Sequence, residues 1–118
     1  MRDKGTFTIT FDEQTLPVIE QISEGLPGGF FIYHADGDQE LIHINGAMLR
    51  IFGCDTLEEF KELTGYTFKG IVHPADIDKV EESICTQIGR GGDNLDYVEY
   101  RIVRKDGTVR WVEDYGHF

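Results

Sequence analysis

The chain has 118 residues, enough for one domain with a single hydrophobic core. Hydrophobic residues make up 40% and charged residues 28%, and no apolar run approaches the ~20 residues of a membrane helix, which excludes direct membrane insertion. The net charge of -11 argues against nucleic acid as a partner, because a phosphate backbone would be repelled.

The first residues predict a strand and then a short helix. Residues 5–11 alternate Thr with Phe or Ile, which is the two-residue period of a β-strand. Residues 12–24 predict an amphipathic helix, with Pro17 tolerated in its first turn and Asp12 or Thr15 as its cap. Its apolar positions are three residues apart: Leu16, Ile19 and Ile22.

Three glycines and a proline over residues 25–29 then break the chain. We therefore expect an N-terminal segment, residues 1–25, and a larger domain over residues 26–118. Residues 29–35 and 40–45 predict two strands that are joined by an acidic turn at Asp36, Gly37 and Asp38.

Helical patterns follow in the middle of the chain. Asn45 is expected to cap a helix that ends at Gly53, in the manner of a left-handed C-cap. Asp55 or Thr56 is expected to cap a second helix, which runs through Leu63.

The next stretch, residues 65–74, has no helical or strand period and is expected to be irregular. Asp76 is expected to cap a longer helix through about Ile88, with apolar residues at helical spacing. Four acids gather in the first half of this helix, as the helix dipole favours: Asp76, Asp78, Glu81 and Glu82.

The most informative pattern is a β-hairpin over residues 99–112, in which Asp106-Gly107 separates two runs rich in β-branched and aromatic residues. Alternation across this turn places five residues on one side: Val98, Tyr100, Ile102, Val109 and Trp111. The other side is mixed, and the helix over residues 16–22 is expected to cover it, within the chain or in a dimer. The order of elements predicts an α+β domain with an antiparallel sheet.

No catalytic or metal-binding motif is evident. The four histidines never approach a metal-ligand spacing such as His-x-x-x-His. His73 is expected to brace the loop before the long helix, and His34 and His43 to form a solvated cross-strand pair. Cys54 and Cys85 are expected to be reduced, semi-buried thiols in a cytoplasmic protein, since no secretory signal is evident.

Several short motifs over residues 26–118 occur in an order that resembles the PAS domain of bacterial sensor proteins. Its motif Asn-x-x-x-Leu-x-x-Phe-Gly is matched by Asn45, Leu49, Phe52 and Gly53, and its Leu-x-x-Phe segment by Leu57 and Phe60. The other matches are Val72-His73-Pro74 with Asp76, Glu99-Tyr100-Arg101, Lys105-Asp106-Gly107 and Arg110-Trp111-Val112. The chain resembles most the PAS subclass of diguanylate cyclases and sensor histidine kinases.

The resemblance implies an antiparallel sheet of about five strands with short helices on one face, and a domain that is usually not catalytic. Flavin-binding members carry the string Asn-Cys-Arg-Phe-Leu-Gln, which is absent here. Haem-binding members place a histidine on or near the long helix, and residues 77–88 contain none. Both cofactors, flavin and haem, are therefore disfavoured, and any other cofactor is unknown.

The resemblance also implies one more strand, in the middle of the sheet between its first strand and the hairpin. The sequence ends at Phe118, about where that strand would begin, so we expect a fragment of a longer protein. We expect the Thr6–Phe11 strand to fill this place, from the same chain or from a dimer partner.

The function implied is a cytoplasmic, non-catalytic sensory and dimerisation module. We expect a homodimer that relays a small-molecule or interface signal to an effector domain in the same polypeptide, a diguanylate cyclase or a histidine kinase. The alternatives are a ligand-free interaction scaffold around Trp111 and, less favoured, a small enzyme. Glu99, Arg101 and Arg110 are expected to form a surface salt-bridge ladder.

A ligand pocket is expected between the sheet and the helices. Six residues are candidates for its lining: Leu49, Phe52, Phe60, Ile84, Tyr100 and Trp111. The competing interpretation is that these residues simply fill a core, and it is favoured for so apolar a set.

Overall fold

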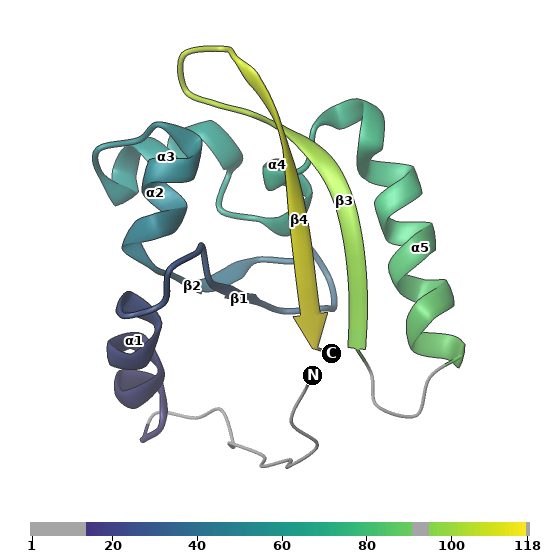
Figure 1. Cartoon of the computed structure of the whole chain (residues 1–118), viewed down its shortest axis with the longest axis horizontal. Coiled ribbons are helices and arrows are strands. Elements are labelled where there is room, and N and C mark those ends of the chain that lie inside the picture. The colour runs from purple at the N-terminus through teal and green to yellow at the C-terminus, as the bar shows by residue number, and fades with distance from the viewer. Residues whose placement is uncertain (1–13, 91–94, 118) are drawn as a thin grey trace.

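The computed structural model describes residues 14–90 and 95–117. The helices and strands occur in this order (Figure 1): α1 (Leu16–Glu24), β1 (Phe31–Tyr33), β2 (Leu41–Ile44), α2 (Gly46–Phe52), α3 (Leu57–Thr64), α4 (Phe68–Ile71), the 3-10 turn η1 (Pro74–Asp76), α5 (Ile77–Arg90), β3 (Leu95–Val103) and β4 (Val109–His117). The α+β class expected from the sequence is confirmed, and within the described ranges no helix is long and apolar enough to cross a membrane. The strand predicted over residues 5–11 lies outside these ranges.

The strands form two separate antiparallel hairpins. β1 pairs with β2 through Phe31 and Ile44, and β3 pairs with β4 from Leu95 opposite His117 to Val103 opposite Val109. The expected sheet of about five strands is therefore not what the described residues form, since no pairing joins the two hairpins among them. Alternation in a sequence identifies a strand, but it carries no information about which strand edges pair. In Figure 1, α5 runs along β3, while α2 and α3 lie at the opposite side of the molecule.

Side-chain caps set the helix starts. The Asn45 side chain accepts a hydrogen bond from the backbone N–H of Met48 at 3.3 Å, and α2 ends at Gly53 with a φ of 72°, so both expectations are confirmed. Thr56 caps α3 by accepting a hydrogen bond from the N–H of Glu59 at 3.1 Å. α4, which Thr67 caps, lies in the stretch expected to be irregular, because a single turn is too short to show an apolar period.

The start of α5 differs from the sequence expectation. His73 rather than Asp76 acts as the cap: its Nδ1 accepts a hydrogen bond from the N–H of Ala75 at 3.0 Å at the start of η1. The His73 N–H donates to the carbonyl oxygen of Arg101 at 2.8 Å, which confirms that this histidine braces the loop before the long helix. The Asp76 carboxylate is directed at β3 instead.

Asp76 is held by Arg101 of β3. Its Oδ2 accepts from the backbone N–H and the Nε of Arg101 at 2.9 and 3.0 Å, and its Oδ1 accepts from Nη2 at 2.6 Å. Only 5% of Asp76 is exposed. This pair replaces the expected surface ladder of Arg101 with Glu99 and Arg110, because the carboxylate of Asp76 gives the guanidinium two parallel hydrogen bonds.

The core joins both hairpins to the helices. Phe60 and Ile102 have no exposed surface, and Phe68 packs against both hairpins. The Phe68 ring is stacked 4.6 Å from that of Tyr33 and meets that of Tyr100 edge-on at 6.1 Å. The two hairpins are therefore coupled through side chains.

The register of the long hairpin puts Trp111 on the outer face. Trp111 lies opposite Arg101, and Val112 lies opposite Tyr100; directly opposed residues share a face of a sheet. Trp111 is 69% exposed, with the guanidinium of Arg101 5.6 Å from its ring centre. The expectation that Trp111 and Val109 share a side with Tyr100 is wrong. The connection between Val103 and Val109 has an odd number of residues, and a change of one residue in its length moves every side chain of β4 to the other face of the hairpin.

α1 packs beside β2 and the start of α2, not over the outer face of β3 and β4. Ser23 Oγ lies 2.9 Å from Nε2 of His43, and Nδ2 of Asn45 donates to the Ser23 carbonyl oxygen at 2.8 Å. His43 is buried and His34 exposed, so the expected solvated pair of histidines is wrong. α1 therefore covers His43 and shields it from water.

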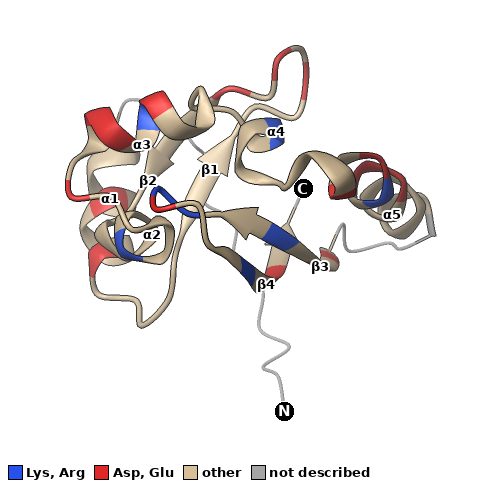
Figure 2. Cartoon of the chain, turned by 90° about the horizontal axis from the view of Figure 1, so that it is seen from above, with Lys and Arg blue, Asp and Glu red and all other residues tan. Residues whose placement is uncertain are grey.

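Acidic side chains lie along two of the helices: Figure 2 shows Asp and Glu residues along α3 and α5.

Replacing Gly70 is expected to be costly, because a Cβ there would overlap the carbonyl oxygen of Thr64. We expect Gly70→Ala to lower the free energy of unfolding by about 1–3 kcal/mol. The matched control is Gly89→Ala in α5, where a Cβ meets no atom within 4 Å and the helix gains up to ~1 kcal/mol. Urea unfolding measures both; equal changes in the two variants would contradict the expectation.

Asp76→Asn is expected to remove part of the acid sensitivity of the fold. The hydrogen bonds from Arg101 hold the pKa of Asp76 well below its usual range. Its ionised form therefore stabilises the fold above the unfolded-state pKa of about 3.9, and this contribution is lost as the pH falls towards the folded-state pKa. Urea unfolding near neutral pH and at about pH 3 should show a smaller difference in the variant than in the parent protein.

The control for this measurement is Glu82→Gln, on the exposed surface of α5. It should keep the pH dependence of the parent protein. An Asp76→Asn variant that is as acid-sensitive as the parent protein would show that the Asp76–Arg101 pair does not set this dependence.

Candidate functional site

A groove of about 970 Å³ lies between the two hairpins. One wall is formed by Gly28–Tyr33, which ends with β1, and the other by residues 112–117 of β4. Helical residues make the floor, and they are mostly apolar: Met48, Ile51, Phe52, Phe68, Ile71 and Ile84. In the part of the chain that the structure describes, β1 and β4 each pair with one strand only, so both walls carry an open strand edge.

Two carboxyl groups and a phenol that line the groove lie close together: Asp96, Asp114 and Tyr100. Tyr100 donates its hydroxyl hydrogen to Oδ2 of Asp114 at 2.7 Å. Burial raises the pKa of Asp114; the Tyr100 hydrogen bond lowers it and the nearby Asp96 raises it. Burial also raises the pKa of Asp96, and His117 opposes this shift. Gly116 leaves room for Asp96, because a Cβ there would lie 2.8 Å from its Oδ1.

The phenols of the groove remain neutral hydrogen-bonding groups. Burial, followed by the charges of Asp96 and Asp114, raises the pKa of Tyr33 to about 12. Burial and Asp114 raise the pKa of Tyr100 further. The groove therefore combines an apolar floor with a cluster of hydrogen-bonding groups, an arrangement suited to holding a molecule or segment in one orientation.

Three of the six residues predicted to line a pocket do line this groove: Phe52, Ile84 and Tyr100. Leu49 and Phe60 pack within the core beside α2 and α3 and do not border the groove, and Trp111 lies on the outer face of the hairpin. Sequence reasoning missed Asp96 and Asp114. Their signal was present, because Asp96 shares the alternation of Val98, Tyr100 and Ile102, which point inwards.

The cysteines do not contribute to the groove. Both are free thiols: Cys54 is buried at the end of α2, and Cys85 is exposed on α5, contrary to the expectation that both are semi-buried. Burial raises the pKa of the Cys54 thiol. Among the described residues, no group of His, Cys, Asp and Glu side chains has the arrangement of a metal site.

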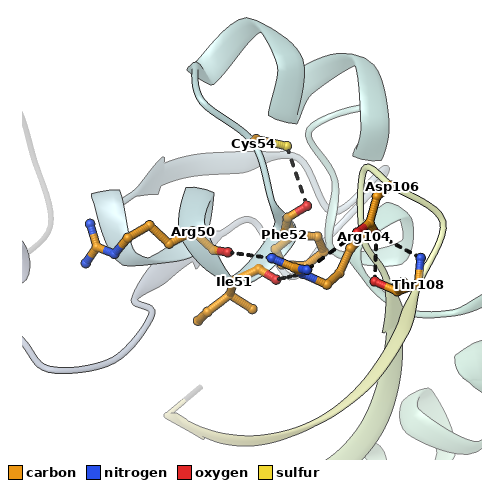
Figure 3. A network of polar contacts seen from close by, with 7 residues as sticks. All are labelled: Arg50, Ile51, Phe52, Cys54, Arg104, Asp106 and Thr108. Atoms are coloured by element: carbon orange, nitrogen blue, oxygen red, sulfur yellow. Dashed lines mark hydrogen bonds and ion pairs between the residues drawn. The ribbon is translucent and has the colours of Figure 1, made fainter.

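The tip of the long hairpin is fastened to the end of α2 (Figure 3). Arg104 donates from Nε to the carbonyl oxygen of Ile51 at 3.0 Å and from Nη2 to that of Arg50 at 3.3 Å. The Lys105 N–H donates to the Phe52 carbonyl oxygen at 2.9 Å. A guanidinium at this end of the helix is favoured, since the last carbonyl groups of a helix lack partners within it. One end of the hairpin is therefore fixed against a helix that supplies the floor of the groove.

The fold and the groove define an α+β domain of the type found in sensory proteins, and the comparisons agree. A family profile described as PAS fold matches residues 41–118, and the chain belongs to this family. Among solved structures, an RNA-binding light-oxygen-voltage receptor shares the fold, with a TM-score of 0.60 and 17% sequence identity over 98% of this chain. The chain covers 31% of that receptor.

A second solved structure is the PAS domain of a GGDEF family protein from Chromobacterium violaceum. It is 31% identical to this chain, with 75% of this chain and 77% of that chain covered and a TM-score of 0.32. No curated protein matches the sequence.

Two substitutions are expected to move the pKa of Asp114 in opposite directions. Tyr100→Phe removes the hydroxyl that stabilises the carboxylate and should raise this pKa, whereas Asp96→Asn removes a nearby negative charge and should lower it. An NMR titration of the Asp114 carboxyl carbon measures both. Tyr115→Phe is the control, because its hydroxyl donates to Glu113 rather than to Asp114. Shifts of the same sign in the first two variants would contradict this description of the groove.

Proposed function

We propose that this chain is a non-catalytic sensory module, in which occupancy of the groove is the event that is sensed. The observation that carries the proposal is the position of the groove between two hairpins that are coupled through side chains. An occupant touches both hairpins at once. A ligand that binds better to one arrangement of the hairpins than to another shifts the population towards that arrangement.

The chemistry of the groove supports binding rather than catalysis. Burial raises the pKa of Asp96 and Asp114 and that of the Tyr33 phenol, and all three side chains offer oxygen atoms for hydrogen bonds with a bound molecule. The ligand expected from this lining is a small, largely apolar molecule with a hydrogen-bond donor directed at Asp96 and Asp114. Flavin and haem remain disfavoured on the sequence motifs: the flavin-binding string Asn-Cys-Arg-Phe-Leu-Gln is absent, and residues 77–88 of the long helix contain no histidine.

The module is proposed to act in the cytoplasm on an effector domain of the same polypeptide, a diguanylate cyclase or a histidine kinase. The 31% identity to the PAS domain of a GGDEF family protein supports the first of these. The acidic charge supports partners other than nucleic acid.

A homodimer is part of the proposal, and the outer face of the long hairpin supports it. Several large side chains there are exposed: Leu95, Tyr97, Val109, Trp111 and Tyr115. The same observation favours the second candidate function, a ligand-free scaffold that docks a partner on this face.

Native mass spectrometry, compared with the denatured mass, tests the sensory proposal. We expect a mass excess on the native protein that disappears on denaturation, because a ligand held in the groove is released on unfolding. Ile84→Trp should fill the groove and reduce the retained mass. Val109→Trp is the control, since Val109 is exposed on the outer face.

A native protein without added mass would contradict ligand sensing. A bare dimer would favour the scaffold instead, and dissociation of that dimer by Trp111→Ala would locate its interface on the outer face.

A further inference from the structure

We propose that the segment Thr6–Phe11 of this chain binds in the groove as an added β-strand on the open edge of β4. These residues lie outside the described part of the structure, so the proposal rests on their sequence and on the groove. It deepens the proposed function, because a ligand of the groove would compete with this strand. The strand itself requires no ligand.

The two edges of the long hairpin differ in whether their outward backbone groups have hydrogen-bond partners. On the β3 edge, side chains satisfy the backbone: the Gln87 amide donates to the Tyr97 carbonyl oxygen and accepts from its N–H, both at 2.8 Å. At Arg101, the Asp76 carboxylate accepts from the backbone N–H, and the backbone N–H of His73 donates to the carbonyl oxygen. No such contact is seen on the β4 edge among the described residues. Tyr97 directs its backbone groups away from β4 and lies opposite Tyr115, so the free N–H and C=O groups of this edge belong to the residues that alternate with the half-buried Val112, Asp114 and Gly116. An open edge of this kind favours a partner strand.

The length of the segment matches the edge. Residues 112–117 of β4 line the groove, and the segment Thr6–Phe11 has the same number of residues. At about 3.3 Å per residue, each extends over roughly 20 Å. An antiparallel or parallel ladder between them would therefore run along the whole wall.

The alternation of the segment matches the groove. Phe7, Ile9 and Phe11 would point together into the apolar floor, because side chains two residues apart share a face of a strand. The Thr side chains between them would then point out of the groove, as befits an exposed face.

The lack of acidic residues in the segment suits the acidic groove. The groove and its rim carry Asp96, Glu113 and Asp114, which would repel an acidic occupant. Although the chain has 22 Asp and Glu residues, residues 5–11 contain none; Arg2, Asp3 and Lys4 precede them, and Asp12 and Glu13 follow. The β4 edge of a second copy would instead bring Glu113 and Asp114 against the same residues. The N-terminal segment is therefore the better occupant.

Two substitutions that add the same charge to opposite faces of the segment test the proposal. Ile9→Asp would place a carboxylate on the apolar floor, whereas Thr8→Asp would place one on the outer face. Amide hydrogen exchange of β4 and of residues 6–11 is measured in each variant and in the parent protein. We expect Ile9→Asp to accelerate exchange at these amides by about tenfold or more, and Thr8→Asp by less than about twofold.

Equal exchange in the two variants, or unprotected residues 6–11 in the parent protein, would overturn the proposal. Deletion of residues 1–11 provides a second measurement, because it should expose the β4 amides to the same extent as Ile9→Asp. Failure of the strand proposal is distinct from failure of ligand sensing, which is measured by the mass retained in the native protein.

Discussion

The carboxylate of Asp76 fixes the position of the long hairpin, on which the shape of the groove depends. Three hydrogen bonds reach it from the backbone and the guanidinium of Arg101, so the start of α5 is held at one point along β3. β4 pairs only with β3 in the described ranges, and β4 is one wall of the groove. Removal of Arg101 leaves the buried carboxylate of Asp76 without compensation, which costs more free energy than the intact pair contributes, whereas the Arg101 side chain remains one-third exposed to water.

A second fixed point lies at the tip, where Arg104 binds the last carbonyl groups of α2. The hairpin is thus held at its tip by one helix and in its middle by another, and Gln87 holds β3 near Tyr97. β4 has no comparable contact to a helix among the described residues. Of the two strands, β4 is therefore the one whose position responds most directly to what lies in the groove.

The parts of the fold that the sequence predicts are those decided within a few residues. Asn45 and Gly53 set the ends of α2 through contacts made within one helical turn, and Thr56 does the same for α3. The register of the hairpin depends on the parity of its connection, which the Asp106-Gly107 motif does not specify. The role of Asp76 was not predicted either. A carboxylate just before a helix is typical of a helix cap, and the actual partner, Arg101, lies 25 residues further along the chain.

The candidate site was predicted in part, for a related reason. Apolar residues such as Phe52 and Ile84 signal burial, and the groove borders the core, so both line it. Alternation along β3 already indicated that Asp96 points inwards, but its approach to Asp114 depends on the register, because the two residues lie on different strands and far apart in sequence. The hydrophobic pattern of the sequence therefore predicted part of the apolar floor of the groove but not its polar residues, Asp96 and Asp114.

The edge of β4, which has no partner strand among the described residues, also bears on aggregation. Exposed strand edges promote aggregation, because each edge offers a template on which another copy can add. The net charge of -11 opposes such contacts through repulsion between copies. This repulsion acts over a screening distance of about 8 Å at physiological ionic strength and shortens as salt is added. The acidic surface therefore opposes edge-to-edge contacts between copies at any strand edge left open, and this repulsion weakens in concentrated salt.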